Sequence, residues 1–294
     1  MTFYALTMKL IRSILVACIM LFLTYTLCHW KFMKDTPSYR ESNIHKALIA
    51  AKTKAEDIRW IHDTCSELNH TAFIYTTETP PESDLLIPRS ARGREAAAYL
   101  SFIIDYYHEL PAYSIFIHAN QEQWHNDLFG PRTRDVLRHL RYEAVDAQGY
   151  VNLRCMENPG CPISANPLNP TQNDISRDDV RAHLAEIYMD LFAVPRENVP
   201  KHIGGVCCAQ FAVSRKQILR RPRRDYERML RWVAETQTTD DFGVGWVMEK
   251  VWHIVFGMEA IYCPQYNQCR CDNYGWCGPL QSGDILTPVA AARN

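Results

Sequence analysis

The sequence predicts an α/β protein with a single domain, built on a mainly parallel sheet that is flanked by helices. Apolar residues recur at helical spacing from Ala96 to Tyr107, and after Pro111 a short aromatic and β-branched run, Tyr113 to Ile117, has the character of a buried strand. Helical and extended patterns then alternate along the chain, as in parallel sheets covered by helices. With 294 residues, 47% of them hydrophobic, the chain can bury the core of one large domain.

The N-terminus carries an apolar run, Ser13 to Cys28, which is about long enough to span a bilayer. A cleaved signal peptide is the alternative, but no clear small-x-small cleavage site follows the run. We predict a cytosolic tail over residues 1–12, a transmembrane signal anchor over 13–30, and a body in the lumen of the endoplasmic reticulum or Golgi. The positive charges at Lys31 and Lys34 count against this orientation.

Cysteine usage agrees with an oxidising compartment. Two of the 11 cysteines fall within the apolar run, so nine remain outside it. Their spacing lacks the paired CxxC pattern of zinc sites, so disulfides are favoured, with the pairing open and at least one thiol free or intermolecular. The clustered ones are Cys155, Cys161, Cys263, Cys269, Cys271 and Cys277. Asn69-His70-Thr71 is a glycosylation sequon and fits the same compartment.

The domain is expected over residues 66–278, after a stem over 31–65 and before a C-terminal tail over 279–294. The stem is polar, with helical stretches around Ile44 to Ile58. Strands are expected at Ala72–Thr76, Tyr113–Ile117, Tyr150–Leu153 and Val206–Ser214. Helices are expected at 94–107, at 134–141, from Ser176 with Asp179 completing a capping box, and at Trp246–Phe256.

Charge argues against nucleic acid as a partner. The formal net charge is -1, and no stripe of Lys and Arg is interleaved with aromatic residues. Nucleotide-binding P-loops, GxSxG elbows and HExxH motifs are absent from the sequence, which disfavours P-loop NTPases, serine hydrolases of that type and zinc proteases.

The first candidate site is the polar loop His118 to Asp127, directly after the central predicted strand. It holds Asn120, Trp124 and His125 together with further amides and carboxylates. In open α/β sheets ligands bind beyond the C-terminal ends of strands, so this loop could hold a metal or a polyhydroxylated ligand. The alternative is structural: His118 caps the strand end, and Trp124 with His125 packs a surface helix.

A second candidate is the pair Glu249 and His253, four residues apart on the last predicted helix. The pair could be a general acid or base with its orienting partner, or an ordinary ion pair on a helix face. Asp241, which follows Asp240 ahead of Gly243, could bind a cation or only start a turn.

Several blocks, in one order, carry a resemblance to a known family. They include GREAAAYLSFIIDYYHELP, SIFIHANQEQWHND, CCAQFAVSRKQILRRP and EKVWHIVFG, within a match from about Thr71 to Cys277. They closely resemble the fungal family known as domain of unknown function 3431. More distantly, their order resembles bacterial polysaccharide glycosyltransferases with a type-A nucleotide-sugar-binding fold.

The glycosyltransferase resemblance implies a membrane-anchored lumenal enzyme that transfers a sugar from a nucleotide sugar to a small-molecule or glycan acceptor. His118 and Asn120 would then face the donor diphosphate, and Trp124, His125 and Asp241 would contact the substrate. Type-A enzymes usually hold a divalent metal such as manganese with Asp-x-Asp, but this chain reads His118-Ala119-Asn120, so the metal is left undecided.

The same resemblance places Glu95 at the base of the site and makes Glu249 an acid/base or acceptor-binding carboxylate, with His253 beside it. Two other functions stay open. One is a tailoring enzyme of fungal secondary metabolism with non-glycosyl chemistry. The other is a non-catalytic lumenal binding protein held together by disulfides.

Overall fold

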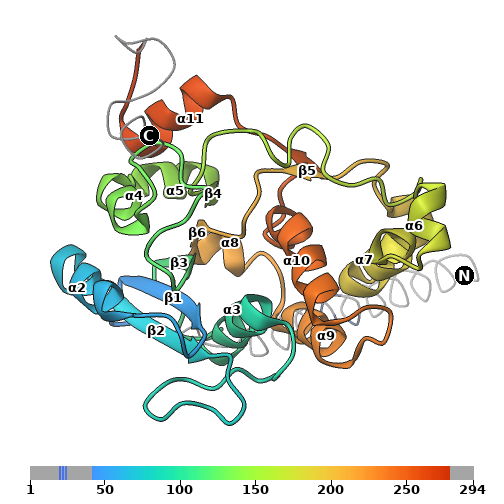
Figure 1. The fold of residues 1–294 in the computed structure, drawn as a ribbon, viewed down its shortest axis with the longest axis horizontal. Coiled ribbons are helices and arrows are strands. Elements are labelled where there is room, and N and C mark those ends of the chain that lie inside the picture. Colours follow the sequence, from blue (N-terminus) through green and yellow to red (C-terminus); the bar gives the residue numbers. More distant parts are fainter. Residues whose placement is uncertain (1–19, 21, 23, 25–41, 279–294) are drawn as a thin grey trace, which may run out of the picture. The chain divides into compact units, whose positions relative to one another are not determined.

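A five-stranded sheet lies at the centre of the domain (Figure 1). The computed structural model describes residues 42–278 together with residues 20, 22 and 24, and residues 42–278 belong to one compact unit. The strand order is β2-β1-β3-β6-β4. The strands are β1 (Lys46–Lys52), β2 (Thr71–Thr76), β3 (Tyr113–His118), β4 (Tyr150–Asn152) and β6 (Phe211–Ser214). A separate two-stranded sheet pairs β5 (Gly204–Gly205) with β7 (Ile261–Tyr262).

The sheet is mixed, so the prediction of a mainly parallel sheet is wrong. Strand β1 pairs in parallel with β2 and β3, whereas β6 is antiparallel to both of its neighbours, β3 and β4. The sequence of β6, Phe-Ala-Val-Ser, is a continuous apolar run that suits a buried strand of either direction. Its pattern therefore predicted a strand but could not give its direction. The strand is also shorter than the predicted Val206–Ser214.

The segment around Ile44 to Ile58, predicted to be helical, contains strand β1. Its sequence, KALIAAK, consists largely of good helix formers. It lies between β2 and β3, and Ala47, Leu48, Ile49 and Ala50 are fully buried. Pairing on both edges outweighs the local helical preference, as tertiary context often does. The central strand thus falls inside the range 31–65 that we interpreted as a stem.

Helices cover both faces of the sheet. Because side chains alternate along a strand, Phe116 points into one apolar cluster while Ile115 and Ile117 point into the other. The Phe116 side is covered by α3 (Arg94–Asp105), α7 (Leu184–Phe192), α9 (Arg223–Glu235) and α10 (Asp241–Val255). The opposite side is covered by α2 (Arg59–Leu68), α4 (Thr133–His139), α5 (Tyr142–Gln148) and α11 (Tyr266–Tyr274).

The remaining short helices are α6 (Gln172–Ser176), α8 (Arg215–Ile218) and the 3-10 turns η1 (Val180–His183) and η2 (Arg196–Asn198). Helix α3 and strand β3 confirm the central prediction closely. The predicted helix start at Ser176 is wrong: Thr171 and Asp174 form the capping box, which belongs to α6. Asp179 caps the 3-10 turn η1 by accepting from the backbone of Arg181, and α7 begins only at Leu184.

Four disulfides confirm the interpretation of the cysteines. They are Cys155–Cys269, Cys161–Cys263, Cys207–Cys208 and Cys271–Cys277, and Cys65 is the free thiol among the described residues. Two of the bridges connect the C-terminal segment to the loop after β4. In Figure 1 this segment, with α11, lies beside α4 and α5.

No helix among residues 42–278 is long and apolar enough to cross a membrane. The predicted anchor over residues 13–30 lies outside the described residues, apart from 20, 22 and 24. The predicted tails, residues 1–12 and 279–294, lie outside them as well.

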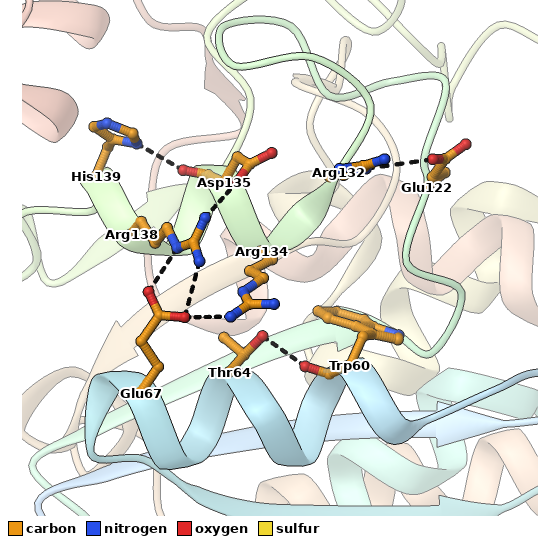
Figure 2. A network of polar contacts seen from close by, with 9 residues as sticks. All are labelled: Trp60, Thr64, Glu67, Glu122, Arg132, Arg134, Asp135, Arg138 and His139. Carbon is orange, nitrogen blue, oxygen red and sulfur yellow. Dashed lines mark hydrogen bonds and ion pairs between the residues drawn. The ribbon is translucent and has the colours of Figure 1, made fainter.

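A network of charged side chains ties α2 to α4 (Figure 2). Glu67 of α2 accepts from Arg138 over 2.7 and 2.9 Å, and also from Arg134. On the same helix, the indole nitrogen of Trp60 donates to the backbone oxygen of Ala119, 2.8 Å away. Helix α2 therefore holds both α4 and the start of the loop that follows β3.

We expect Glu67→Gln to lower the free energy of unfolding at neutral pH but not in strong acid. The two arginines, Arg138 first, lower the pKa of Glu67 to about 2. Since the folded pKa lies below the usual value of 4.5, the stabilisation is fully present above about pH 4.5 and is lost as the pH falls to about 2. Urea unfolding at several pH values checks this. A difference between variant and wild type that does not shrink in acid would contradict it. The control is Glu122→Gln, at the exposed pair with Arg132.

Candidate functional site

Four strands end at one edge of the sheet. Strands β1, β2 and β3 are parallel, and β4 runs in the same direction because both β3 and β4 are antiparallel to β6. Their last residues are Lys52, Thr76, His118 and Asn152. Ligands of open α/β sheets bind outside the C-terminal ends of strands. The predicted loop His118 to Asp127 therefore starts at the edge where a ligand is expected.

His118 is fixed at the end of β3 by two hydrogen bonds. Its backbone N–H donates to the side-chain oxygen of Gln210 over 3.2 Å, and its Nε2 lies 2.8 Å from the carbonyl oxygen of Cys208. A carbonyl oxygen can only accept, so Nε2 carries a proton, and in the corresponding neutral tautomer Nδ1 presents a lone pair. The half-buried imidazole can thus accept a hydrogen bond from a ligand or coordinate a metal ion through Nδ1.

The partner of His118 belongs to a disulfide between adjacent residues, Cys207 and Cys208. Cys208 and Ala209 both have a positive backbone angle φ, 83° and 48°, which residues other than glycine rarely adopt. The next residue, Gln210, donates from its amide to the side chain of Asn126 over 3.1 Å. This short segment therefore connects the start of β6 with the loop after β3.

The loop itself is folded inward. His125, Asn126 and Asp127 are buried, whereas Trp124 is 75% exposed. The amide of Asn126 donates to the carbonyl of Pro131 and to Thr133. No helix forms between β3 and α4, so the alternative in which Trp124 and His125 pack a surface helix is wrong. The loop presents Trp124 to solvent from a base held by buried polar contacts.

Arg154 lies just beyond β4 and is a buried cation that contacts the loop after β3. Its guanidinium donates to the carbonyl oxygens of His125 at 2.8 Å, Met156 at 3.1 Å and Asn158. It also lies 5.8 Å from the ring of Trp124. Burial, followed by electrostatic effects of His118 and Arg154, lowers the pKa of His125 to about 3. His125 is therefore neutral, and the positive charge of the loop resides on Arg154.

Asp127 ends the loop and is almost fully buried. One carboxylate oxygen accepts from the backbone N–H groups of Cys155 and Met156, at 2.9 and 2.5 Å, while the other has no partner. Burial raises the pKa of this carboxyl, and the backbone of Met156 and the charge of Arg154 oppose the rise. Asp127 thus fastens the loop after β3 to the loop after β4.

Glu95 and Asp241 lie where the N-termini of α3 and α10 meet. Asp241 accepts from the backbone of Gly93 at 2.6 Å and pairs with Arg94 at 3.0 Å, so it holds the start of α3. Glu95 is half-buried, and a Cβ atom on Gly245 would lie 3.9 Å from its carboxylate. Helix α3 follows the parallel strand β2, which places its N-terminus at the ligand edge. No contact in the described part of the chain joins Glu95 or Asp241 to His118.

Glu249 and His253 lie one turn apart on α10 but are not joined by a hydrogen bond. Glu249 pairs with Lys250 over 2.8 Å. His253 is buried, and its Nε2 donates to the carbonyl of Ala260 over 3.1 Å. Burial lowers the pKa of His253 to about 4, so the ring is neutral at pH 7. Its Nδ1 faces Gly205, where an added Cβ would come within 2.8 Å. The proposed catalytic pairing stays a prediction.

We expect the folded protein to lose stability relative to its His253→Gln variant as the pH drops from 6.5 to about 4. The folded pKa is below the usual 6.5, so in this window the unfolded chain binds a proton that the folded chain does not. The expected slope difference is up to ~1.4 kcal/mol per pH unit. Denaturant unfolding across the window measures it. Equal slopes would contradict it, and His62→Gln, at an exposed position, is the control.

A family model matches residues 48–272, from strand β1 to helix α11. Its description is "Protein of unknown function (DUF3431)". The chain belongs to the DUF3431 family. No curated protein and no solved structure gives a significant match. The resemblance to DUF3431 is therefore confirmed, and the matched range includes all the residues described at the ligand edge.

Among the described residues of the DUF3431 domain, no group of three or more His, Cys, Asp or Glu side chains is arranged to hold a metal. At the edge itself, the atoms that could contribute to a metal site are Nδ1 of His118 and the exposed side-chain oxygen of Asn120, which accepts from the backbone of Glu122 at 3.4 Å.

Sequence reasoning missed three parts of the candidate site. Arg154 was not singled out, and Asp127 was named only as the end of the candidate loop and not as its anchor, because the partners of both are backbone groups distant in sequence. The Cys207–Cys208 bridge was also missed, although adjacent cysteines in a chain with several disulfides were an available signal. Asn69, the predicted glycosylation site, is exposed at the C-terminal end of α2, and its modification stays a prediction.

Proposed function

We propose that the DUF3431 domain is a glycosyltransferase that transfers a sugar from a nucleotide-activated donor to an acceptor. One observation carries the proposal: the polar loop that holds His118 and exposed Trp124, together with buried Arg154 from the loop after β4, lies where four strands of common direction end. Phosphate-bearing nucleotides bind at this edge in open α/β sheets. The mixed sheet does not oppose this, because β6 alone runs the other way.

Four residues at this edge, His118, Asn120, Trp124 and Arg154, have proposed roles in donor binding. The exposed ring of Trp124 is available to stack on a base or sugar. The charge of Arg154 favours an anionic diphosphate nearby. The Nδ1 atom of His118 is not used by the bond to Cys208, so its lone pair suits a sugar hydroxyl or a divalent cation such as manganese. With Asn120 it would hold such a cation, which would supply charge neutralisation at the diphosphate.

Two carboxylates compete for the acid/base role at the acceptor. Glu95 is half-buried, and its carboxylate has no hydrogen-bond or ion-pair partner among the described residues. Glu249 is held by Lys250. Product formation from labelled nucleotide sugars distinguishes them when Glu95→Gln and Glu249→Gln are compared with Glu259→Gln, an exposed control position. Loss of product in one variant identifies the acid/base group. Unchanged product in Glu249→Gln would remove Glu249 from that role.

A second candidate function is ligand binding without turnover. The pairing of Glu249 with Lys250 and the buried, neutral His253 favour it, because neither group is placed as a free acid or base. Nucleotide-sugar binding without product would support it. Ligand binding without any response to nucleotides would instead support the tailoring enzyme. In each case we propose a membrane-anchored lumenal protein whose ligand is a small molecule or glycan.

A further inference from the structure

A pocket of about 170 Å³ lies between strand β4 and helix α11. Tyr150 and Asn152 of β4, Gln268 and Asn273 of α11, and His253 of α10 contribute to its wall. A cavity of about 150 Å³ admits benzene, so this pocket has room for one six-membered ring. Two of its lining residues are named above: Arg154 is proposed to attract the donor diphosphate, and His253 is predicted beside Glu249. The other lining residues have no role in the proposed donor binding or catalysis.

Two disulfides hold the wall of the pocket together. Cys155–Cys269 and Cys161–Cys263 join the segment after β4 to the C-terminal segment, and Cys263 and Cys269 both lie in the pocket wall. Walls held by covalent bonds do not have to be ordered when a ligand enters, which lowers the entropic cost of binding. The pocket is thus preformed.

Amides are the most frequent polar side chains in the lining. The amide of Gln148 donates to Asn273 at 3.0 Å, and Asn152 both donates to the carbonyl of Val206 and accepts from the backbone of Arg154. These bonds orient the amides. Each amide group both donates and accepts, which matches ligands whose hydroxyl groups do the same. The amides in the wall are Gln148, Asn152, Gln265, Gln268 and Asn273.

The pocket also offers aromatic surface and little net charge. Tyr262 is half-buried in the wall, with its ring centroid 6.0 Å from that of Tyr150. The two charged residues of the lining, Arg154 and Asp272, are of opposite sign, and His253 is neutral. Such a lining disfavours phosphates and carboxylates and favours a neutral ring with one apolar face.

We propose that this pocket binds one uncharged sugar residue, through the amides of β4 and α11 and the ring of Tyr262. Arg154 forms part of its wall and also donates to the loop after β3, so the bound sugar would lie next to the ligand edge. The proposal does not require sugar transfer, because it applies equally to a protein that only binds.

Saturation-transfer NMR tests the proposal on the full-length chain, purified in a detergent without a sugar headgroup. The probes are methyl glycosides of glucose, galactose, mannose and N-acetylglucosamine, with glucuronate and glucose 6-phosphate as charged comparators. The variant Gln265→Ala/Gln268→Ala removes two exposed amides of the wall. The matched control is Gln237→Ala, an exposed glutamine outside the pocket.

We expect a saturation-transfer signal for at least one neutral glycoside. Binding of that glycoside should be roughly tenfold weaker in the double variant and unchanged in the control. The proposal would be overturned if no neutral glycoside gave a saturation-transfer signal with protein that is shown to unfold cooperatively. Binding that survives the double substitution, or that is stronger for the charged sugars, would overturn it too. No nucleotide is present, so a failure here is distinct from a failure of the proposed transfer reaction.

Discussion

Replacing Arg154 with methionine is expected to lower the free energy of unfolding by about 3–5 kcal/mol. The side chain is 6% exposed, and it donates to three backbone carbonyls. Methionine fills much of the volume but leaves these carbonyls without their donor. It also removes the positive charge that favours the ionised form of buried Asp127. Urea unfolding measures the loss.

Arg132 provides the matched control for this substitution. It lies in the same region of the chain, but its side chain is 61% exposed and approaches Glu122 only to 3.5 Å. Arg132→Met is expected to change stability by less than about 1 kcal/mol. Comparable losses for the two variants would show that Arg154 does not hold the loops after β3 and β4 together.

Removing the Cys155–Cys269 disulfide should cost more than removing the Cys271–Cys277 disulfide, although both involve α11. The first joins residues 114 positions apart and the second residues 6 positions apart. Loop-closure entropy in the unfolded chain gives roughly 4–5 kcal/mol for the long bridge and roughly 2 kcal/mol for the short one. Cys155 is also fully buried, which adds a packing loss.

Paired alanine substitutions, Cys155→Ala/Cys269→Ala and Cys271→Ala/Cys277→Ala, measure this difference by denaturant unfolding. The long bridge also fixes the pocket wall, so its loss should weaken glycoside binding, whereas loss of the short bridge should not. Equal destabilisation by the two double variants would contradict the assignment of the long bridge as the main attachment of the C-terminal segment.

Local sequence signals were sufficient where an element is defined by its own pattern. The helix Arg94–Asp105 and the strand Tyr113–His118 follow their periodicity closely. Strand β1 did not, because its alanines and lysines favour a helix in isolation and become a strand only between two partners. The direction of β6 likewise depends on its neighbours and not on its residues.

The candidate site could likewise be predicted only where its residues follow a local sequence pattern. The polar residues after β3 were recognisable because they stand at a strand end. The contribution of Arg154 could not be recognised, because its acceptors are the backbone oxygens of His125, Met156 and Asn158. A sequence does not show which backbone carbonyls lack a partner within helices and strands. The separation of Glu249 from His253 arises because His253 turns toward Ala260 and Glu249 pairs with Lys250.

A thermal-shift screen tests the central claim most directly, with nucleotide diphosphates and nucleotide sugars added to the full-length protein with and without manganese. A ligand that binds only the folded state raises the melting temperature, because binding adds to the free energy of unfolding. At a ligand concentration one hundred times Kd the added free energy is about 2.7 kcal/mol. We predict a shift with one nucleotide class, reduced in His118→Ala and unchanged in Gln237→Ala. If the folded protein shows no shift with any nucleotide, the assignment of this edge as a nucleotide-sugar site is wrong.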